Sequence, residues 1–352
     1  MAAAPRGWAG GSRWTWRPVA RDALLARAFH SCTELRGRLY LVGGLLAGGA
    51  TEPSGDTVVL DLEGDQAVRM GARGGPRRSH HDAVPLGGRW LCAVGGWDGS
   101  RRLAAVAALD TERGEWEAWA AAPGSCPPAG LSSHTCTRLS DREVRVAGRE
   151  GGTRTQRRFG SIYTLRLDPG ARTYCYKEEG DHTASRSGHC AALLRGPGPR
   201  PAHQLLLFGG CSSAEPEVAG HWSPGTIKDE PTVAPRLMEQ LAKFVSSGRG
   251  SQQGPRGLRH HSCSVVGPFA VMFGGEALTR PRDAVCNDLY IYDARKSRQS
   301  PSLWFHFPCA DRGLKRVGHR TCLWNDQLYL VGGFGEDGRT ASPQVYVLDL
   351  FI

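Results

Sequence analysis

Pairs of histidine and cysteine, separated by one residue, recur at His30/Cys32, His134/Cys136 and His261/Cys263. Imidazole nitrogen and thiolate sulfur are ligands that zinc prefers in proteins. A structural zinc site draws its four ligands from one region, however, and these pairs lie far apart in the sequence. Residues two apart on a strand share a face, where cysteine behaves as a small buried hydrophobe. We therefore predict no metal and no other cofactor, and we expect the histidines to hydrogen-bond backbone groups between neighbouring repeats.

Five arginines precede such histidines at a nearly constant spacing. Four lie three residues before the histidine and the fifth lies two residues before it: Arg27, Arg78, Arg186, Arg316 and, last, Arg259. A planar guanidinium group offers paired donors that match a carboxylate. If the fold brings these positions together, they would bind a chain terminus or Glu and Asp side chains of a partner. The alternative is that they satisfy loop carbonyl groups and bind no partner.

The histidines belong to a repeated unit that ends in a glycine pair. In the first copy, residues 29–44, a short run of small residues leads to a turn at Arg36-Gly37 and then to an apolar run, 39–42. This pattern predicts two strands joined by a tight turn. The unit recurs, with 13 to 20 residues from the histidine to the first residue of the pair, at His81, His134, His189, His261 and His319.

Two further strands follow the glycine pair in the complete copies. In the second copy these are residues 104–110 and 116–119, with a turn at 111–114. Each unit therefore has four antiparallel strands over roughly 50 residues, which is typical of one propeller blade. The 47 glycines among 352 residues suit a protein with many tight turns, because glycine reaches positive φ without steric cost.

The last copy stops before its fourth strand, whereas the N-terminus contains one spare strand at 14–19. Pairing the two would close a ring and cover faces that an open array exposes. We therefore predict an all-β, six-bladed propeller over residues 12–352, closed by the strand at 12–20, after a disordered segment at 1–11. The expected blades span residues 27–71, 78–120, 130–178, 186–257, 258–308 and 316–350.

The fourth copy departs from the pattern after Gly210, and residues 212–257 are predicted to form an insertion. Within it, apolar residues follow helical spacing over 235–245, and a Gly/Ser-rich linker follows at 246–257. The apolar face would either dock against the fourth blade or bind another protein as a helix in a groove. We expect docking, because an exposed apolar stripe promotes aggregation.

Three features of the repeat resemble the kelch family. They are the glycine pair, the tyrosine of the third strand and the tryptophan of the fourth strand, seen in Tyr163, Tyr290, Tyr346, Trp116 and Trp304. The resemblance covers about residues 12–350, and it implies a β-propeller fold with a protein-interaction function. Two departures stand out, since Ala147 replaces the first glycine of the third copy and the first copy lacks the tryptophan. No second domain such as a BTB domain is visible, so the family's ubiquitin-ligase adaptor architecture does not carry over as a whole.

In a kelch propeller, equivalent positions of successive blades circle the axis, so the five arginines would converge near one end of the channel. The loops at that end resemble the family's ligand-binding face. We predict a monomeric, non-catalytic protein-interaction module that binds an acidic or C-terminal segment of a partner protein there. The alternative is a substrate-recognition subunit of a cullin-type ubiquitin ligase, in which the helix near 235–245 recruits other subunits.

Other function classes find little support. The net charge of +10, from 44 basic and 34 acidic residues, permits an acidic partner without naming one. A basic stretch at 149–158, followed by Phe159, is predicted to be a solvated loop, and no recognised nucleic-acid module is present. No Gly-x-Ser-x-Gly, His-Glu-x-x-His or phosphate-cradling motif appears, so we predict no enzymatic activity.

The cysteines and the N-terminus favour an intracellular protein of the cytoplasm, the nucleus or both. There are 11 cysteines, an odd number, and none is paired as Cys-x-x-Cys. The N-terminus lacks an apolar signal core, and no run approaches the ~18 apolar residues of a membrane span. Residues 1–21 contain four arginines and no acid, as in a mitochondrial presequence, but their glycines and prolines oppose the helix that such a signal needs.

Overall fold

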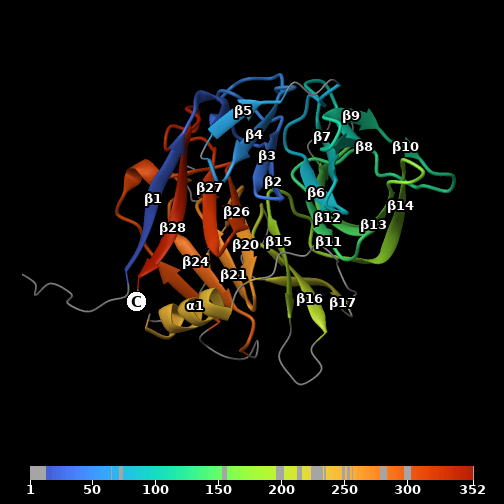
Figure 1. The fold of residues 1–352 in the computed structure, drawn as a ribbon. Helices are drawn as coiled ribbons and strands as arrows, with labels where there is room; N and C mark the ends of the chain where they lie inside the picture. The colour runs from blue at the N-terminus through green and yellow to red at the C-terminus, as the bar shows by residue number, and fades with distance from the viewer. Residues whose placement is uncertain are drawn as a thin grey trace, which may run out of the picture.

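The protein is seen here as a computed structural model. It describes residues 13–64, 66–70, 74–152, 157–195, 202–211, 216–222, 233, 235–247, 250–251, 254–255, 257–277, 284–296 and 303–351. The predicted disordered segment at 1–11 lies outside these residues. Nearly all described elements are strands, arranged in antiparallel sheets as predicted for a kelch propeller (Figure 1).

The first three repeats each form one sheet, numbered here in chain order. The first sheet runs β2 (Ser31–Leu35), β3 (Arg38–Val42), β4 (Thr57–Asp61), β5 (Gln66–Arg69). The second runs β6 (Asp82–Leu86), β7 (Trp90–Trp97), β8 (Arg102–Asp110), β9 (Glu115–Ala118). The third runs β11 (Thr135–Arg138), β12 (Glu143–Gly151), β13 (Arg157–Asp168), β14 (Thr173–His182), and β10 (Ala120–Ala121) adds in parallel to β14.

The last three repeats form the remaining main sheets. The fourth contains β15 (Cys190–Arg195), β16 (His203–Phe208), β17 (Glu217–Trp222). The fifth runs β20 (Ser262–Val266), β21 (Phe269–Phe273), β24 (Leu289–Asp293), β25 (Trp304–Phe307), β18 (Gly250–Ser251). The sixth runs β26 (Arg320–Trp324), β27 (Gln327–Val331), β28 (Gln344–Phe351), β1 (Arg13–Arg21). The shorter elements are β19 (Leu258–Arg259), β22 (Glu276–Ala277), β23 (Ala284–Val285), η1 (Ala23–Leu25), η2 (Arg312–Leu314).

The predicted turn at Arg36-Gly37 is confirmed. Both residues have positive φ, 54° and 76°, and Leu35 pairs directly with Arg38 across the turn. Two consecutive residues of this kind form the tight turn whose twist matches the flanking strands.

The N-terminal strand β1 completes the sixth sheet. It pairs antiparallel with β28, so that Trp16 lies opposite Leu348 and Thr15 lies opposite Asp349. Figure 1 shows the blue strand β1 running alongside the red strand β28. The first and last described strands therefore share one hydrogen-bonded ladder, as the spare N-terminal strand predicts.

The first strands of the six main sheets contact one another in a cycle: β2, β6, β11, β15, β20, β26 and again β2. A backbone hydrogen bond accompanies each contact. The N–H of each residue before a repeat histidine donates to the carbonyl oxygen of its counterpart in the preceding repeat, at 2.7 to 3.1 Å. These residues all have positive φ, and they are Phe29, His80, Ser133, Gly188, His260 and Gly318. The N–H of Phe29 donates to Gly318, so the six bonds return to their starting point.

A buried apolar cluster fills each junction between neighbouring sheets. The junction of the first and second sheets, for example, buries Tyr40 of β3 against Leu91 of β7. That of the sixth and first sheets buries Val331 against Leu39. Equivalent clusters occupy the other four junctions. Burial of apolar surface between sheets is therefore the main stabilising contribution.

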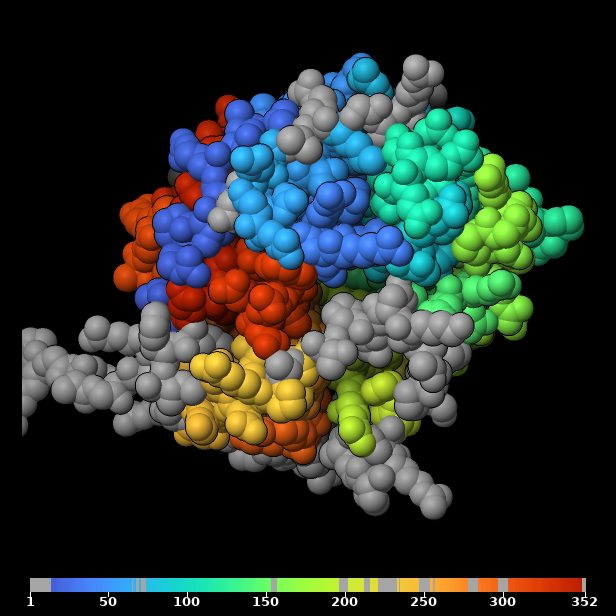
Figure 2. All heavy atoms as spheres, viewed as in Figure 1, coloured from blue at the N-terminus to red at the C-terminus, as the bar shows by residue number. Residues whose placement is uncertain are grey.

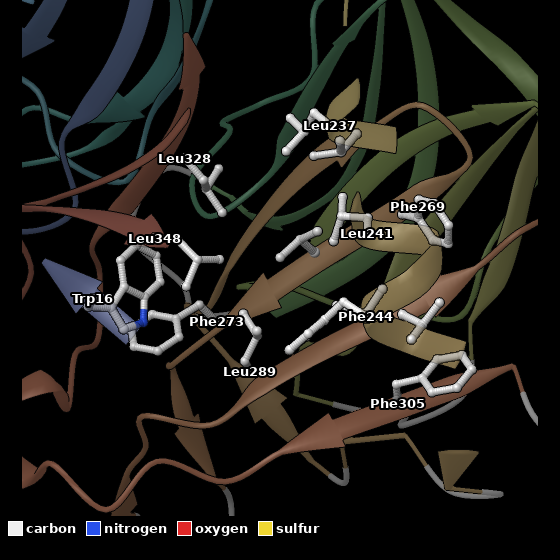
Figure 3. Packing of buried hydrophobic residues seen from close by; sticks show 14 of the residues in the cluster. Trp16, Leu237, Leu241, Phe244, Phe269, Phe273, Leu289, Phe305, Leu328 and Leu348 are labelled. Atoms are coloured by element: carbon white, nitrogen blue, oxygen red, sulfur yellow. The ribbon is translucent and has the colours of Figure 1, made fainter. Parts of the chain in front are cut away.

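The helix predicted at 235–245 is present as α1 (Pro235–Ser247). Its predicted docking against the fourth blade is wrong, because Leu241 and Phe244 are buried in the cluster between the fifth and sixth sheets (Figure 3). Phe244 stacks on Phe307 of β25 with ring centroids 4.3 Å apart. In Figure 2, α1 (yellow) lies beside the orange segments of the fifth repeat and below the red ones of the sixth. The fourth sheet has its own third strand, because residues 217–222, within the predicted insertion, form β17 and pair with β16. The helix is therefore not needed to cover β16.

Candidate functional site

The five predicted site arginines lie at the loop end of the repeats, where the first strand of each sheet begins. Three of them donate from Nη1 to the carbonyl oxygen of the first glycine of the pair in their own repeat. These bonds join Arg27 to Gly43 at 2.9 Å, Arg78 to Gly95 at 3.0 Å and Arg186 to Gly209 at 3.1 Å. The arginine therefore recurs with the glycine pair because it binds a carbonyl group of that pair in the same repeat.

The backbone of the same arginines holds the preceding repeat. The carbonyl oxygen of Arg27 accepts from the N–H of Gly333 at 2.8 Å, and that of Arg78 accepts from Gly44 at the same distance. The neighbouring Gly332 has φ of 67°, and a Cβ there would lie 2.5 Å from the Arg27 oxygen. Only glycine allows this approach without a shift of the backbone, which explains the glycine pair.

Acidic side chains of the following loops or strands pair with several of these arginines. Arg186 bonds to Glu217, Nε of Arg259 lies 2.8 Å from Glu276, and Arg27 approaches Asp56 at 4.0 Å. Arg316 instead donates to the carbonyl oxygens of Gly313 and Lys315 and to Ser342.

Four of the five arginines are at most 7% exposed, and only Arg259 is partly exposed. The structure thus brings the five to one end of the molecule, with their donors turned toward the protein's own carbonyl and carboxylate oxygens.

Three of the six repeat histidines, His81, His189 and His319, hydrogen-bond across neighbouring sheets, and the last two reach a backbone carbonyl oxygen as predicted. Nε2 of His319 lies 3.0 Å from both Ser262 Oγ and the Phe273 carbonyl oxygen of the fifth sheet. His81 contacts Ser31 of the first sheet at 2.9 Å, and His189 contacts Thr135 of the third sheet at 3.1 Å. Each bond links the start of one sheet to the sheet before it.

Burial keeps these histidines neutral. It lowers the pKa of His134 and His261 to about 4, and that of His189 and His319 to about 3, where nearby Arg186 and Arg316 add to the effect. Desolvation disfavours the imidazolium form, so at pH 7 each ring donates through one nitrogen only.

A central cavity of about 240 Å³ lies between the first strands. At its loop end Phe29 stacks on His80 with ring centroids 4.2 Å apart, and His260 makes a T-shaped contact with Phe29 at 5.0 Å, so three rings line this end. Farther in, Nε of Arg320 donates to the His30 carbonyl oxygen at 3.0 Å, and Nη1 lies 3.4 Å from Asp82. Arg320 of the sixth sheet thereby ties the first and second sheets together.

The described residues contain no group of three or more His, Cys, Asp or Glu side chains arranged to hold a metal ion. The cysteines of the three predicted pairs, Cys32, Cys136 and Cys263, are distributed around the cavity wall, one to a sheet. In the part of the chain that the structure describes, no helix combines the length and the apolar character needed to cross a membrane.

Comparison with known proteins identifies the family. No family model matches the chain. Human kelch domain-containing protein 9 is 80% identical over 347 residues, which cover 99% of each chain. The mouse protein of the same name is 78% identical, with 98% of each chain covered. The chain belongs to the kelch domain-containing protein 9 family. A weaker similarity, 27% identity over 80% of this chain, relates it to 10% of human multiple epidermal growth factor-like domains protein 8.

Sequence reasoning missed Arg320 and Asp82 in this member of the kelch domain-containing protein 9 family. Each directly follows a repeat histidine, at a position where the other copies have serine, threonine or cysteine. The charged residue at this position faces the cavity in both repeats. The replacement of a small residue by a charged one was therefore the sequence signal for these two residues.

Part of the basic stretch at 149–158, predicted to be a loop, belongs to strands: residues 149–151 end β12 and residues 157–158 begin β13, while 153–156 lie outside the described residues. β12 and β13 continue their pairing, with Arg149 opposite Phe159 and Glu150 opposite Arg158. The Arg149 guanidinium lies 4.0 Å from the centre of the Phe159 ring, and the side chain is buried. A cation stacked in this way inside a hairpin does not offer its charge to a nucleic-acid backbone.

Proposed function

We propose that the chain is a closed, six-bladed propeller that acts as a non-catalytic protein-interaction module. The cycle of six backbone hydrogen bonds, from Phe29 through the repeats to Gly318, supports the blade number and the closure. The pairing of β1 with β28 supports the part played by the N-terminal strand. In this proposal the blades are rigid and the loops make the contacts.

The observation that carries the proposed function is the anchoring of the loops by the five predicted site arginines, which we call the ring arginines. Arg27, Arg78 and Arg186 each fix a loop through the carbonyl oxygen of a glycine pair. Loops held in this way lose little conformational entropy when a partner binds, and preorganisation of this kind raises affinity. In this proposal the partner lies on the loops rather than inside the channel, because aromatic rings line the loop end of the cavity.

An acidic or carboxylate-bearing segment is the partner chemistry that we propose, on the basis of the net charge of +10. The ring arginines would act as positioning residues, since their donors are already engaged. The contacts would come from exposed cations at the same end, such as Arg101 and Arg339.

Charge reversal tests this proposal. A library of displayed peptides with free C-termini, selected on the full chain, should yield sequences rich in Asp and Glu. Arg101→Glu with Arg339→Glu should abolish this selection while leaving thermal stability nearly unchanged. Arg36→Glu with Arg113→Glu, at the turns of the opposite end, is the matched control and should select the same peptides as the wild type. Selection of peptides without acidic residues, or equal loss in the control, would overturn the proposal.

The alternative, a substrate-recognition subunit of a cullin-type ubiquitin ligase, relies on α1 as the recruiting helix. The apolar side chains that would recruit another subunit, among them Leu241 and Phe244, are buried against the fifth and sixth sheets. This packing favours the simple interaction module.

A further inference from the structure

Two cysteine thiols meet where the sixth sheet contacts the first. Sγ of Cys322, on β26, lies 3.5 Å from Sγ of Cys32, on β2, and also donates to the Cys32 carbonyl oxygen at 3.2 Å. The two residues are 290 positions apart in the chain. We call the junction between these two sheets the seam, because the first and last described strands meet in the sixth sheet beside it.

The seam lacks a contact that three other junctions have. His81, His189 and His319 each hydrogen-bond a hydroxyl of the preceding sheet. At the seam the equivalent position is Arg320, which cannot accept a hydrogen bond. Among the described residues, neither ring nitrogen of the fully buried His30 finds a partner. The junctions entered by His134 and His261 share this lack, but neither of them coincides with the ends of the chain.

One of the two cysteines lies at the wall of the central cavity. Cys32 lines the 240 Å³ cavity, whereas Cys322 lies behind it and is buried. The other cavity thiols have different surroundings, since the thiol of Cys190, for example, donates to the carbonyl oxygen of His261 at 3.0 Å. The seam therefore combines a cysteine at the cavity wall with a second thiol in contact.

We propose that Cys32 and Cys322 form an oxidisable pair whose disulfide closes the ring covalently at the seam. Hydrogen peroxide is the oxidant that balances the reaction. The Cys32 thiolate attacks one peroxide oxygen, the O–O bond breaks, and water leaves after protonation. The Cys322 sulfur then attacks the resulting sulfenic acid, its S–H proton and the hydroxyl leave as a second water, and the S–S bond forms. Two thiols are oxidised by two electrons, and one peroxide is reduced to two waters.

The pair is built for slow oxidation. The hydrogen bond from Cys322 and the burial of the site both raise the pKa of the Cys32 thiol, while the Arg320 guanidinium opposes them. Only the thiolate is nucleophilic, so a raised pKa slows the first step. We therefore expect the disulfide to form only under sustained oxidation, so that the pair does not act as a rapid redox sensor.

Peptide mapping of the full chain tests the proposal. Native protein treated with hydrogen peroxide, or with diamide as a second small two-electron oxidant, should yield a peptide pair cross-linked between Cys32 and Cys322. Oxidation should slow unfolding in urea by about tenfold or more, because the ring can no longer open at the seam, and dithiothreitol should reverse the effect.

Separate variants identify the pair. Cys32→Ser and Cys322→Ala should each lose the cross-link and the slower unfolding, whereas Cys190→Ala should keep both. If a seam variant fails to fold, mapping of the wild type still decides. Absence of the 32–322 peptide after the exposed Cys126 has been oxidised would overturn the proposal. A cross-link that forms only in urea-unfolded protein would overturn it equally.

Discussion

The backbone N–H of Phe29 donates to the carbonyl oxygen of Gly318, 2.8 Å away, and so joins the first repeat to the last. The bond depends on an uncommon backbone conformation, because both residues have positive φ, 55° and 68°. The Phe29 ring lies over Gly318 so closely that a Cβ there would approach its carbons to 3.0 Å.

We predict that Gly318→Ala lowers the free energy of unfolding by about 1–3 kcal/mol, through the strained φ and the contact with Phe29. Gly338→Ala is the matched control, because Gly338 has φ of 65° with no atom near the added Cβ. It should cost only about 1 kcal/mol. Urea unfolding of both variants measures the difference. Equal losses would show that the contact with Phe29 contributes nothing.

A second prediction concerns Arg186, which is fully buried and bonds to Gly209 and Glu217. Arg186→Ala should lower the free energy of unfolding by about 2–4 kcal/mol, because a carbonyl oxygen and a carboxylate lose their partner. Arg77→Ala, at an exposed position directly before Arg78, should change it by no more than about 0.5 kcal/mol. Thermal unfolding gives both values. A stable Arg186→Ala variant that loses only partner binding would support direct contact of this arginine with the partner.

The buried histidines predict sensitivity to acid. Because burial holds the pKa of His189 and His319 at about 3, the unfolded chain binds protons below pH ~6.5 that the folded chain does not. Stability should therefore be complete above pH ~6.5 and fall with pH below it, by about 1.4 kcal/mol per pH unit for each such histidine.

Urea midpoints between pH 7.5 and 5 measure this slope. His319→Asn should be less stable at pH 7 but should show a shallower dependence on pH, whereas His182→Gln, at an exposed position, should leave the slope unchanged. A midpoint that stays constant down to pH 5 would contradict the neutral, hydrogen-bonded histidines.

The packing of α1 provides a further test. Phe244 is fully buried and stacks on Phe307, so Phe244→Ala should lower the free energy of unfolding by about 3–5 kcal/mol. The neighbouring Lys243 is exposed, and Lys243→Ala should have an effect within about 0.5 kcal/mol. Unchanged stability of Phe244→Ala would mean that the helix contributes nothing to the fold and is available to a partner.

The repeat could be predicted because its spacing is set by geometry that every sheet shares. The histidine precedes the first strand of a two-strand hairpin and the glycine pair follows the second, side by side at its open end, so their separation in sequence remains near 13 residues unless a loop lengthens it. The spare strand at 14–19 was visible for the same reason, since every other strand had a place in a copy.

The position of α1 could not be predicted, because an amphipathic pattern reveals which face is apolar and not which surface covers it. Nor could the sequence show where the ring arginines direct their donors. That depends on the path of the loops, and a guanidinium group before a glycine pair fits a partner's carboxylate as well as a backbone carbonyl. Residues 149–151 and 157–158 looked like part of a loop because the stretch is rich in glycine, which is depleted in strands, yet the pairing of β12 with β13 outweighs that preference.

The ladder between β1 and β28 joins two strands that are synthesised far apart in time, because almost the whole described chain lies between them. At about 5–20 residues per second, the N-terminal strand waits tens of seconds for its partner, with Trp14 and Trp16 uncovered. Nascent chains should therefore depend on chaperones until β28 has been synthesised, and truncation before Gln344 should leave β1 and β27 with unpaired edges that promote aggregation.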